Sequence, residues 1–111
     1  MLIALNGSPV STLVRGRHLL VHGRLDVHSA ADVRLALVDA VAEGTGELVV
    51  DLSGVEALDA TGLGVLVGAH RRADRAGRTL VLSDCSLAVA RVLFLTRLEK
   101  VLRTTRGSQV A

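Results

Sequence analysis

The sequence predicts an α/β domain in which a mixed β-sheet of four to five strands packs against three to four α-helices. Short apolar runs alternate with segments of helical periodicity along the chain. The run at Leu48–Leu52 has few polar breaks, which is typical of a strand covered on both faces in a parallel or mixed sheet. Glycines follow the helical segments, where helices commonly end.

The N-terminal half is predicted to hold a hairpin and then a helix. Two apolar runs, Val10–Val14 and His18–His22, flank a glycine turn. The helix is predicted to begin after Ser29, a candidate N-cap, with Asp32 in its first turn, where the helix dipole favours negative charge. Its apolar positions are Val33, Leu37, Val38 and Val41, and Gly44 and Gly46 end it.

A second helix is predicted from about Gly62 to Ala76, and Gly77 terminates it. We expect the ten residues from Leu52 to Thr61 to separate the body of the central strand from the first helix glycine, and Asp51 to point to the loop end. The apolar face of this helix is predicted to hold Leu63, Leu66, Val67 and His70.

The C-terminal part is predicted to hold a strand at Thr79–Leu82, a helix capped by Ser86 and a last strand at Val101–Thr105. The third helix carries Val89, Val92 and Leu93 at helical spacing. We expect one domain spanning residues 1–111, with its core at about 10–105 and flexible ends. Half of the residues are hydrophobic and only one is aromatic, so the core is predicted to be aliphatic.

Charge and cysteine content exclude several classes of protein. Thirteen basic and eleven acidic residues give a net charge of +2, too mild to predict direct nucleic-acid binding. Cys85 is the only cysteine, so we expect an inert, reduced thiol and no disulfide framework.

The apolar segments are too short for targeting or for crossing a membrane. Met1–Leu5 is too short for a signal peptide and Ala60–Ala69 is too short to span a bilayer, so we expect a cytoplasmic protein without membrane insertion.

We interpret the arginine cluster near the end of the second predicted helix as a solvated helix face. It consists of Arg71, Arg72, Arg75 and Arg78.

No cofactor or metal site is predicted. The spacing of Gly62, Gly64 and Gly68 differs from that of a dinucleotide-binding loop, and instead favours glycines that let the helix start pack close to backbone. His18 and His22 share one face of a strand. A metal would need a third ligand such as His28 or Asp26, and no clustered spacing supports one.

Thr61 stands where the predicted loop ends and the helix begins, so its hydroxyl could be a helix cap, a nucleophile or a phosphorylation site. A nucleophile needs an activating base, and His70 lies more than two helical turns away. The carboxylates Asp26, Asp51 and Asp59 fit no named catalytic spacing. We therefore expect no catalytic residue and no enzyme activity. A cap, for which Asp59 competes, and a switch remain open.

The segment VDLSGVEALDATGLGVLVG, residues 50–68, resembles the signature of STAS domains, in particular stand-alone bacterial anti-sigma factor antagonists. Residues 21–26 resemble the Gly-x-Leu-Asp step that precedes the first helix of the family, and residues 80–83 its strand before the third helix. Leu93-Phe94 followed by Leu98 resembles its C-terminal pattern. The chain departs from the family at Arg97, where a glycine is common, and lacks a proline at the start of the third helix.

The resemblance implies that Thr61 is phosphorylated by a serine/threonine kinase that is itself the anti-sigma factor, with ATP as phosphate donor and a phosphatase as the resetting partner. Unphosphorylated, the protein would bind the anti-sigma factor and free a sigma factor for transcription. The implied partner-binding residues are Asp26, Asp59, Ala60, Thr61, Gly62, Leu63 and Gly64. Two alternatives are a STAS subunit of a membrane transport complex, such as a lipid-trafficking ABC transporter, and a nucleotide-binding enzyme, which the absence of a phosphate loop disfavours.

Overall fold

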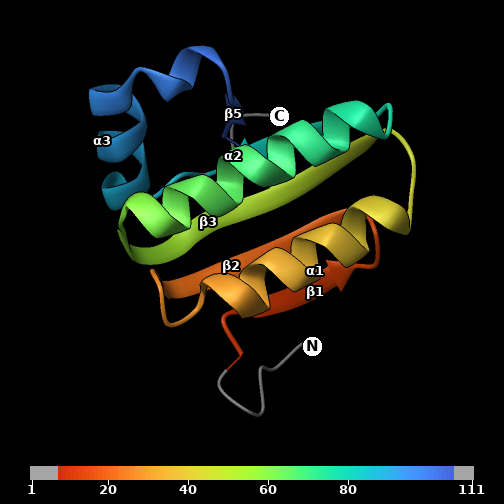
Figure 1. Cartoon of the computed structure of the whole chain (residues 1–111), viewed down its shortest axis with the longest axis horizontal. Coiled ribbons are helices and arrows are strands. Elements are labelled where there is room, and N and C mark those ends of the chain that lie inside the picture. The colour runs from red at the N-terminus through yellow and green to blue at the C-terminus, as the bar shows by residue number, and fades with distance from the viewer. Residues whose placement is uncertain (1–7, 107–111) are drawn as a thin grey trace.

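The computed structural model describes residues 8–106 and contains one five-stranded sheet with the order β1-β2-β3-β4-β5 (Figure 1). β1 and β2 pair antiparallel, and all other neighbours pair parallel, which confirms the predicted hairpin and the mixed sheet. The expectations for Met1–Leu5 and for flexible ends concern residues that lie outside the described range. The strands are β1 (Val10–Val14), β2 (His18–Leu25), β3 (Glu47–Leu58), β4 (Thr79–Ser83) and β5 (Arg103–Thr105).

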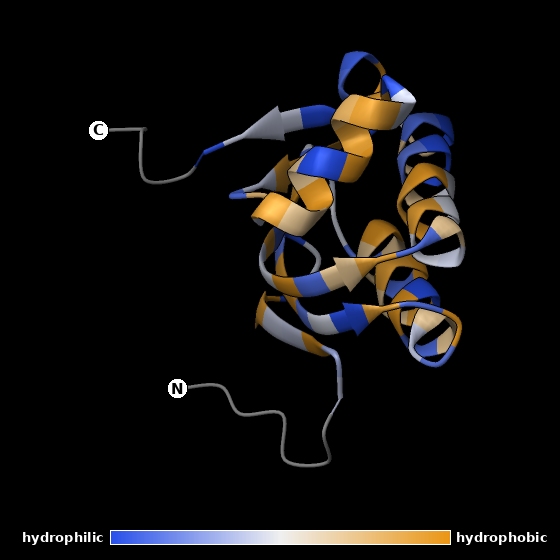
Figure 2. Ribbon diagram, turned by 90° about the vertical axis from the view of Figure 1, so that its left-hand side faces the viewer, coloured by the Kyte–Doolittle hydropathy of each residue, from blue (hydrophilic) through white to orange (hydrophobic). Residues whose placement is uncertain are grey.

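Three α-helices and one short 3-10 helix accompany the sheet: α1 (Ala30–Ala42), α2 (Ala60–Arg75), α3 (Leu87–Thr96) and η1 (Leu98–Lys100). α1 and α2 lie side by side on one face of the sheet, as expected for consecutive right-handed crossovers between parallel strands (Figures 1 and 2). α3 packs against β3 and η1. Within residues 8–106, no helix is both long and apolar enough to cross a lipid bilayer.

The core between the sheet and the helices is aliphatic, as predicted. Its buried hydrophobic side chains are all leucine, valine or alanine. The single aromatic residue, Phe94, is 71% exposed and takes no part in it. The core therefore relies on packed aliphatic side chains drawn from β2, β3, β4 and all three helices, with Val10 of β1 partly buried against them.

Two predictions for the central strand are wrong. The strand buries one face only, because Leu48, Val50 and Leu52 are buried whereas Val49 and Asp51 are half-buried on the other face. Asp51 lies within the strand, where its Oδ1 accepts a hydrogen bond from the backbone N–H of Ser53 at 2.8 Å. The alternation of burial is that of a strand with one face toward a core.

β3 is also longer than predicted, and the expected ten-residue connection is absent. Polar and glycine residues at Ser53 and Gly54 interrupt the apolar run, but pairing with β2 continues past them through Gly54 opposite His22 and Leu58 opposite Leu25. A register shift in the pairing of β2 with β3, between Leu20 and His22, accommodates this interruption. Only Asp59 therefore separates the end of β3 from the start of α2.

The buried side of α2 differs from the predicted one. Only Leu66 of the four predicted residues is buried, because small residues occupy much of the stripe that contacts the sheet. A pattern that weights large side chains misses such a stripe. In α1 and α3, Val38 and Val92 are likewise half-buried rather than buried. The buried residues of α2 are Gly62, Val65, Leu66, Ala69 and Ala73.

Helix and strand ends agree in part with the sequence. The Oγ of Ser86 accepts a hydrogen bond from Val89 N at 3.3 Å, which confirms the predicted cap of α3. The last strand is shorter than predicted and begins at Arg103, because η1 occupies the chain just before it.

The single cysteine, Cys85, is half-buried. Burial, aided by the negative charge of Asp84, raises the pKa of its thiol above the ordinary value.

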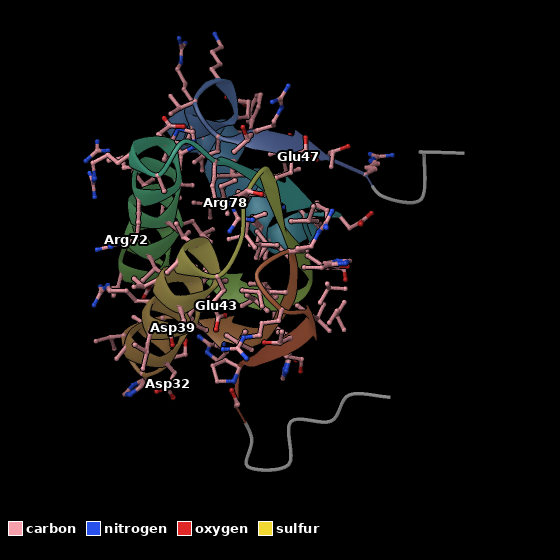
Figure 3. The ribbon with its side chains drawn as sticks, turned by 90° about the vertical axis from the view of Figure 1, so that its right-hand side faces the viewer. Asp32, Asp39, Glu43, Glu47, Arg72 and Arg78 are labelled. Carbon is pink, nitrogen blue, oxygen red and sulfur yellow. The ribbon has the colours of Figure 1, made fainter. Side chains whose placement is uncertain are left out.

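Arg78 contradicts the prediction of a solvated arginine face. Arg71, Arg72 and Arg75 are exposed, but Arg78 is only 4% exposed and lies just before β4 (Figure 3). Its guanidinium donates hydrogen bonds to backbone carbonyls of the β1–β2 turn, the C-terminus of α1 and the segment that starts β3. The acceptors are Gly16, Ala40, Val41, Thr45, Gly46 and Glu47, at distances of 2.6 to 3.4 Å.

Candidate functional site

The junction between β3 and α2 consists of one residue, Asp59, which caps the helix. Its backbone is extended, and its Oδ1 accepts a hydrogen bond from Gly62 N at 2.9 Å. Its carbonyl accepts the first intrahelical hydrogen bond, from Leu63 N at 2.9 Å. Of the two candidates for the cap, Asp59 holds the position, and the interpretation of Thr61 as the cap is wrong.

Thr61 is the second residue of α2, and its side chain is exposed to solvent. Within the described part of the chain its hydroxyl makes no hydrogen bond. The N–H groups of Ala60 and Thr61 belong to the first turn, which has no intrahelical acceptor, and the helix dipole makes this end positive. The hydroxyl is therefore free of any structural role and stands at the end of a helix that favours an added negative charge.

Gly62 fixes the position of this helix end against β2. It is buried, and a Cβ at this residue would lie 2.8 Å from Cγ of Leu25 and would overlap the Leu25 carbonyl. The predicted close approach to backbone is thus confirmed for Gly62. It is wrong for Gly64 and Gly68, which are exposed and would place a Cβ in open space.

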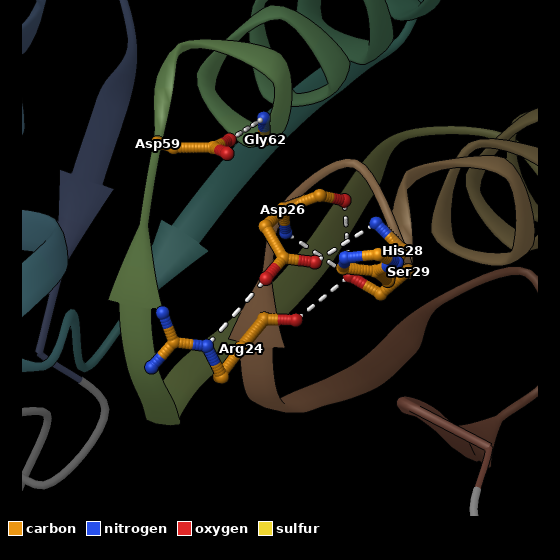
Figure 4. A network of polar contacts seen from close by, with 6 residues as sticks. All are labelled: Arg24, Asp26, His28, Ser29, Asp59 and Gly62. Atoms are coloured by element: carbon orange, nitrogen blue, oxygen red, sulfur yellow. Dashed lines mark hydrogen bonds and ion pairs between the residues drawn. The ribbon is translucent and has the colours of Figure 1, made fainter.

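The pairing of β2 with β3 brings two carboxylates to the same edge of the sheet. Leu25 lies opposite Leu58, so the residues that follow, Asp26 and Asp59, leave the sheet at the same level (Figure 4). The Oδ1 of Asp26 accepts a hydrogen bond from His28 N at 2.9 Å. Asp26 is a largely buried side chain that shapes the β2–α1 turn, whereas Asp59 is exposed.

Sequence reasoning missed the two residues that hold Asp26 in place. The Nε of Arg24 lies 3.5 Å from Oδ2 of Asp26. The hydroxyl of Ser29 donates to the carbonyl of Arg24 at 2.7 Å and accepts from Asp26 N at 3.1 Å (Figure 4). Ser29 does occupy the N-cap position of α1, but its side chain makes no capping hydrogen bond, so the predicted role of its hydroxyl is wrong. The available signal was a serine three residues after an aspartate, a spacing typical of side-chain-bonded turns.

The predicted partner-binding residues differ in their exposure. Gly62 is buried and Leu63 packs against the core, so both position the helix end. Asp26 is half-buried. The residues that present an exposed surface at the junction are Asp59, Ala60, Thr61 and Gly64.

His70 and Asp51, two titratable residues considered in the sequence, lie apart from this junction. Nε2 of His70 is 3.6 Å from Oδ2 of Asp74, its neighbour one turn along α2. Asp51 is in the middle of β3 rather than at its end. Among residues 8–106, no three His, Cys, Asp or Glu side chains are grouped so that they could hold a metal ion.

Comparison with known proteins identifies similar chains. The model of a family described as the STAS domain matches residues 10–111. An anti-sigma-B factor antagonist of Staphylococcus epidermidis is 30% identical over 90 residues, which cover 81% of this chain and 83% of that protein. The crystal structure of an anti-sigma factor antagonist from Mycobacterium paratuberculosis is 27% identical, with a TM-score of 0.74 and coverage of 89% of this chain and 87% of that one. An anti-sigma factor antagonist (STAS) domain protein from Planctomyces limnophilus, at 15% identity, shares the fold with a TM-score of 0.72 over 90% of this chain and 92% of that one.

Proposed function

The chain belongs to the STAS domain family, and from this membership we propose that it is an anti-sigma factor antagonist switched by phosphorylation at Thr61. In its unmodified form it binds an anti-sigma factor that is also a serine/threonine kinase, and so releases a sigma factor. The antagonist names of its relatives support the general role. The free hydroxyl of Thr61 is the observation that carries the assignment of the switch.

The position of Thr61 suits a modification site for a physical reason. A hydroxyl that caps a helix makes a hydrogen bond worth about 1 kcal/mol, and modification would have to rearrange that contact. Asp59 already provides the capping interaction through Gly62 N, so Thr61 can change without disturbing it. The side chain is exposed and within reach of a kinase active site.

In the proposed reaction, Oγ1 of Thr61 attacks the γ-phosphorus of ATP and loses its proton, and ADP leaves. The phosphate stays on the threonine until a phosphatase transfers it to water. This chain supplies the acceptor hydroxyl and its presentation on the first turn of α2. The kinase supplies the base and the nucleotide site.

Phosphorylation changes the junction electrostatically. It adds about −1.5 to −2 charge at neutral pH. The unsatisfied N–H groups of the first turn of α2 favour that charge, whereas the nearby carboxylate of Asp59 opposes it. We expect the fold to remain unchanged, because these two local effects have opposite sign and the site is exposed.

The main effect of the phosphate falls on the complex. A docked partner would bury the phosphate beside Asp59, with neither water nor a matching cation around it. A cost of about 2.7 kcal/mol would weaken binding roughly a hundredfold. In the same proposal, Asp59 and Asp26 shape the docking surface, Asp59 directly and Asp26 through the β2–α1 turn that it holds.

Phosphate mapping tests the assignment. The protein is incubated with ATP and each anti-sigma factor kinase encoded in the same genome, and the modified residue is located by mass spectrometry. We expect phosphate on Thr61 and none on Thr61→Ala. Phosphate on another residue, with Thr61 unmodified, would overturn the site.

Binding measurements test the switch itself. Thr61→Asp should bind the kinase about a hundredfold more weakly than the wild type, with an unchanged circular dichroism spectrum. Thr61→Ser, which keeps the hydroxyl, is the matched control and should bind like the wild type. Equal affinity of Thr61→Asp and wild type would refute the proposed switch.

A further inference from the structure

The outward side of α3 is an exposed apolar surface. Leu87, Phe94 and Leu95 are 75%, 71% and 71% exposed. Residues seven and eight positions apart lie on one side of a helix, so these three share one face with Arg91, four positions after Leu87. We call Leu87, Arg91, Phe94 and Leu95 the α3 face. Figure 2 shows this helix mostly in the hydrophobic colour.

The α3 face differs from the outward sides of the other two helices. Half of the exposed residues of α1 and half of those of α2 are charged, as is usual for amphipathic helices on a protein surface, whereas Arg91 is the one charged residue of α3. α3 instead is apolar toward the core, through Val89 and Leu93, and apolar toward solvent. Exposed clusters of large apolar side chains, aromatic ones above all, are typical of surfaces that bind another molecule.

Basic residues are concentrated in the C-terminal segment of the chain that contains α3. The segment from Ser86 to Arg106 holds five of the thirteen basic residues of the chain and one of its eleven acidic residues. All five basic residues are exposed, and none takes part in a salt bridge between described residues. They are Arg91, Arg97, Lys100, Arg103 and Arg106. Arg91 lies on the α3 face itself and Arg97 is the C-cap of the helix, so this surface fits an apolar partner surface bordered by carboxylates.

The α3 face and the first turn of α2 lie on the same side of the molecule. Both are at the left of Figure 1, and this side faces the viewer in Figure 2. A protein interface of ordinary size buries about 800 Å² on each partner, a patch about 30 Å across. The longest extents of the chain are only 32 Å. A single partner docked at Thr61 can thus also cover α3.

We propose that the α3 face is a second contact surface for the anti-sigma factor that binds at Thr61, and that it takes up an apolar patch with an acidic border on that partner. This inference rests on the proposed function. A second copy of this chain is the weaker candidate, because a symmetric contact of the α3 face would bring Arg91 of one copy near Arg91 of the other. The division of roles is that α3 supplies affinity whatever the state of Thr61, while Thr61 supplies the regulation.

The test measures the affinity of each anti-sigma factor kinase of the same genome for four forms of the full chain. These are the wild type, Phe94→Gln/Leu95→Gln, Leu35→Gln and Thr61→Asp. Leu35 is a matched control, since it is 61% exposed on α1, outside the α3 face. We expect the double variant to lose at least about tenfold in affinity, and Leu35→Gln to bind like the wild type.

Charge gives a second, independent readout. Arg91→Glu should also weaken binding, and the affinity of the wild type should fall as salt rises, more steeply than that of Arg91→Glu. These variants replace exposed side chains, so native circular dichroism spectra are expected for all of them.

The outcomes separate the inference from the function on which it rests. Wild-type affinity of the double variant, with loss of binding in Thr61→Asp, overturns the α3 contact and leaves the proposed function standing. Loss in the double variant with full binding of Thr61→Asp supports the α3 contact and refutes the switch. Two other results would overturn the contact. In the first, the wild type dimerises in sedimentation and the double variant does not. In the second, the wild type binds phosphatidylglycerol vesicles and the double variant does not.

Discussion

The two ends of the parallel strands are built in opposite ways. At the end where β3 and β4 begin, the buried guanidinium of Arg78 donates hydrogen bonds to six backbone carbonyls. At the end where β2 and β3 finish, the hydroxyl of Thr61 is exposed and has no hydrogen bond within the described residues. One end joins three segments of the chain through one side chain, and the other leaves a reactive group free.

Under the proposed function, this difference lets the domain accept a phosphate at Thr61 without losing its fold. Arg78 has no carboxylate partner in a salt bridge between described residues; its charge is met by carbonyl dipoles, two of them at the negative C-terminal end of α1. Breaking such a buried arrangement is costly, because the carbonyls lose their donors. Thr61 has nothing comparable to lose. Four predictions test the comparison, from the largest effect on stability to the smallest.

Arg78→Met should lower the free energy of unfolding by about 3 to 5 kcal/mol, because it removes a donor that serves six buried or half-buried carbonyls. Denaturant unfolding followed by circular dichroism measures it. The control is Arg71→Met, an exposed arginine of α2, which should change stability by less than about 0.5 kcal/mol. A loss below about 1 kcal/mol for Arg78→Met would remove the contrast between the two ends.

Gly62→Ala should lower stability by about 1 to 3 kcal/mol, because the added methyl group overlaps the backbone of Leu25 and forces α2 away from β2. Gly68→Ala, in the same helix but open to solvent, should raise stability by about 0.5 to 1 kcal/mol, since alanine is the better helix former. Changes of the same sign in both variants would contradict the assigned role of Gly62.

Asp59→Ala should lower stability by about 1 kcal/mol through loss of the cap on α2. Thr61→Ala, two residues later, should change it by less than about 0.5 kcal/mol. The same unfolding measurement compares the two variants. An equal loss in both would show that the hydroxyl of Thr61 does structural work and would weaken the case for a free modification site.

Arg97→Gly should raise stability by about 0.5 to 1 kcal/mol. Arg97 ends α3 in the left-handed conformation, with φ of 61°, which glycine adopts without strain. The opposite sign is expected for Arg91→Gly within α3, a loss of about 1 kcal/mol. A loss of stability in Arg97→Gly would show that the arginine side chain makes a compensating contact.

Much of the site was predictable because its signals are local. The cap by Asp59 follows from an acidic residue three positions before Gly62, and its competition with Thr61 was recognised in the sequence. The place of Thr61 at the start of α2 was likewise predictable, whereas its exposure depends on which side of the helix packs on the sheet. The contacts of Arg24 and Ser29 that hold Asp26 in place were not predicted. They depend on how the β2–α1 turn folds back on itself.

The errors in the fold share a cause, which is contact between residues distant in sequence. β3 continues beyond its apolar run because β2 pairs with it as far as Leu58, and a run of apolar letters carries no record of that pairing. The buried stripe of α2 includes Ala69 and Ala73 because the helix lies close to the sheet. Arg78 reads as one more surface arginine until its carbonyl acceptors, 31 to 62 residues earlier, are brought around it.

The sequence by itself determined the order of strands and helices, the aliphatic core, and the hydroxyl at the start of α2, because periodicity, composition and helix capping act over a few residues. Only the tertiary structure decided that Gly62, and not Gly64 or Gly68, is the glycine packed against backbone, that Arg78 is buried, and that the α3 face lies on the same side as Thr61. Those three facts depend on chain segments meeting in space, through the packing of β2 on α2, the closure of the strand starts and the placing of α3 beside β3.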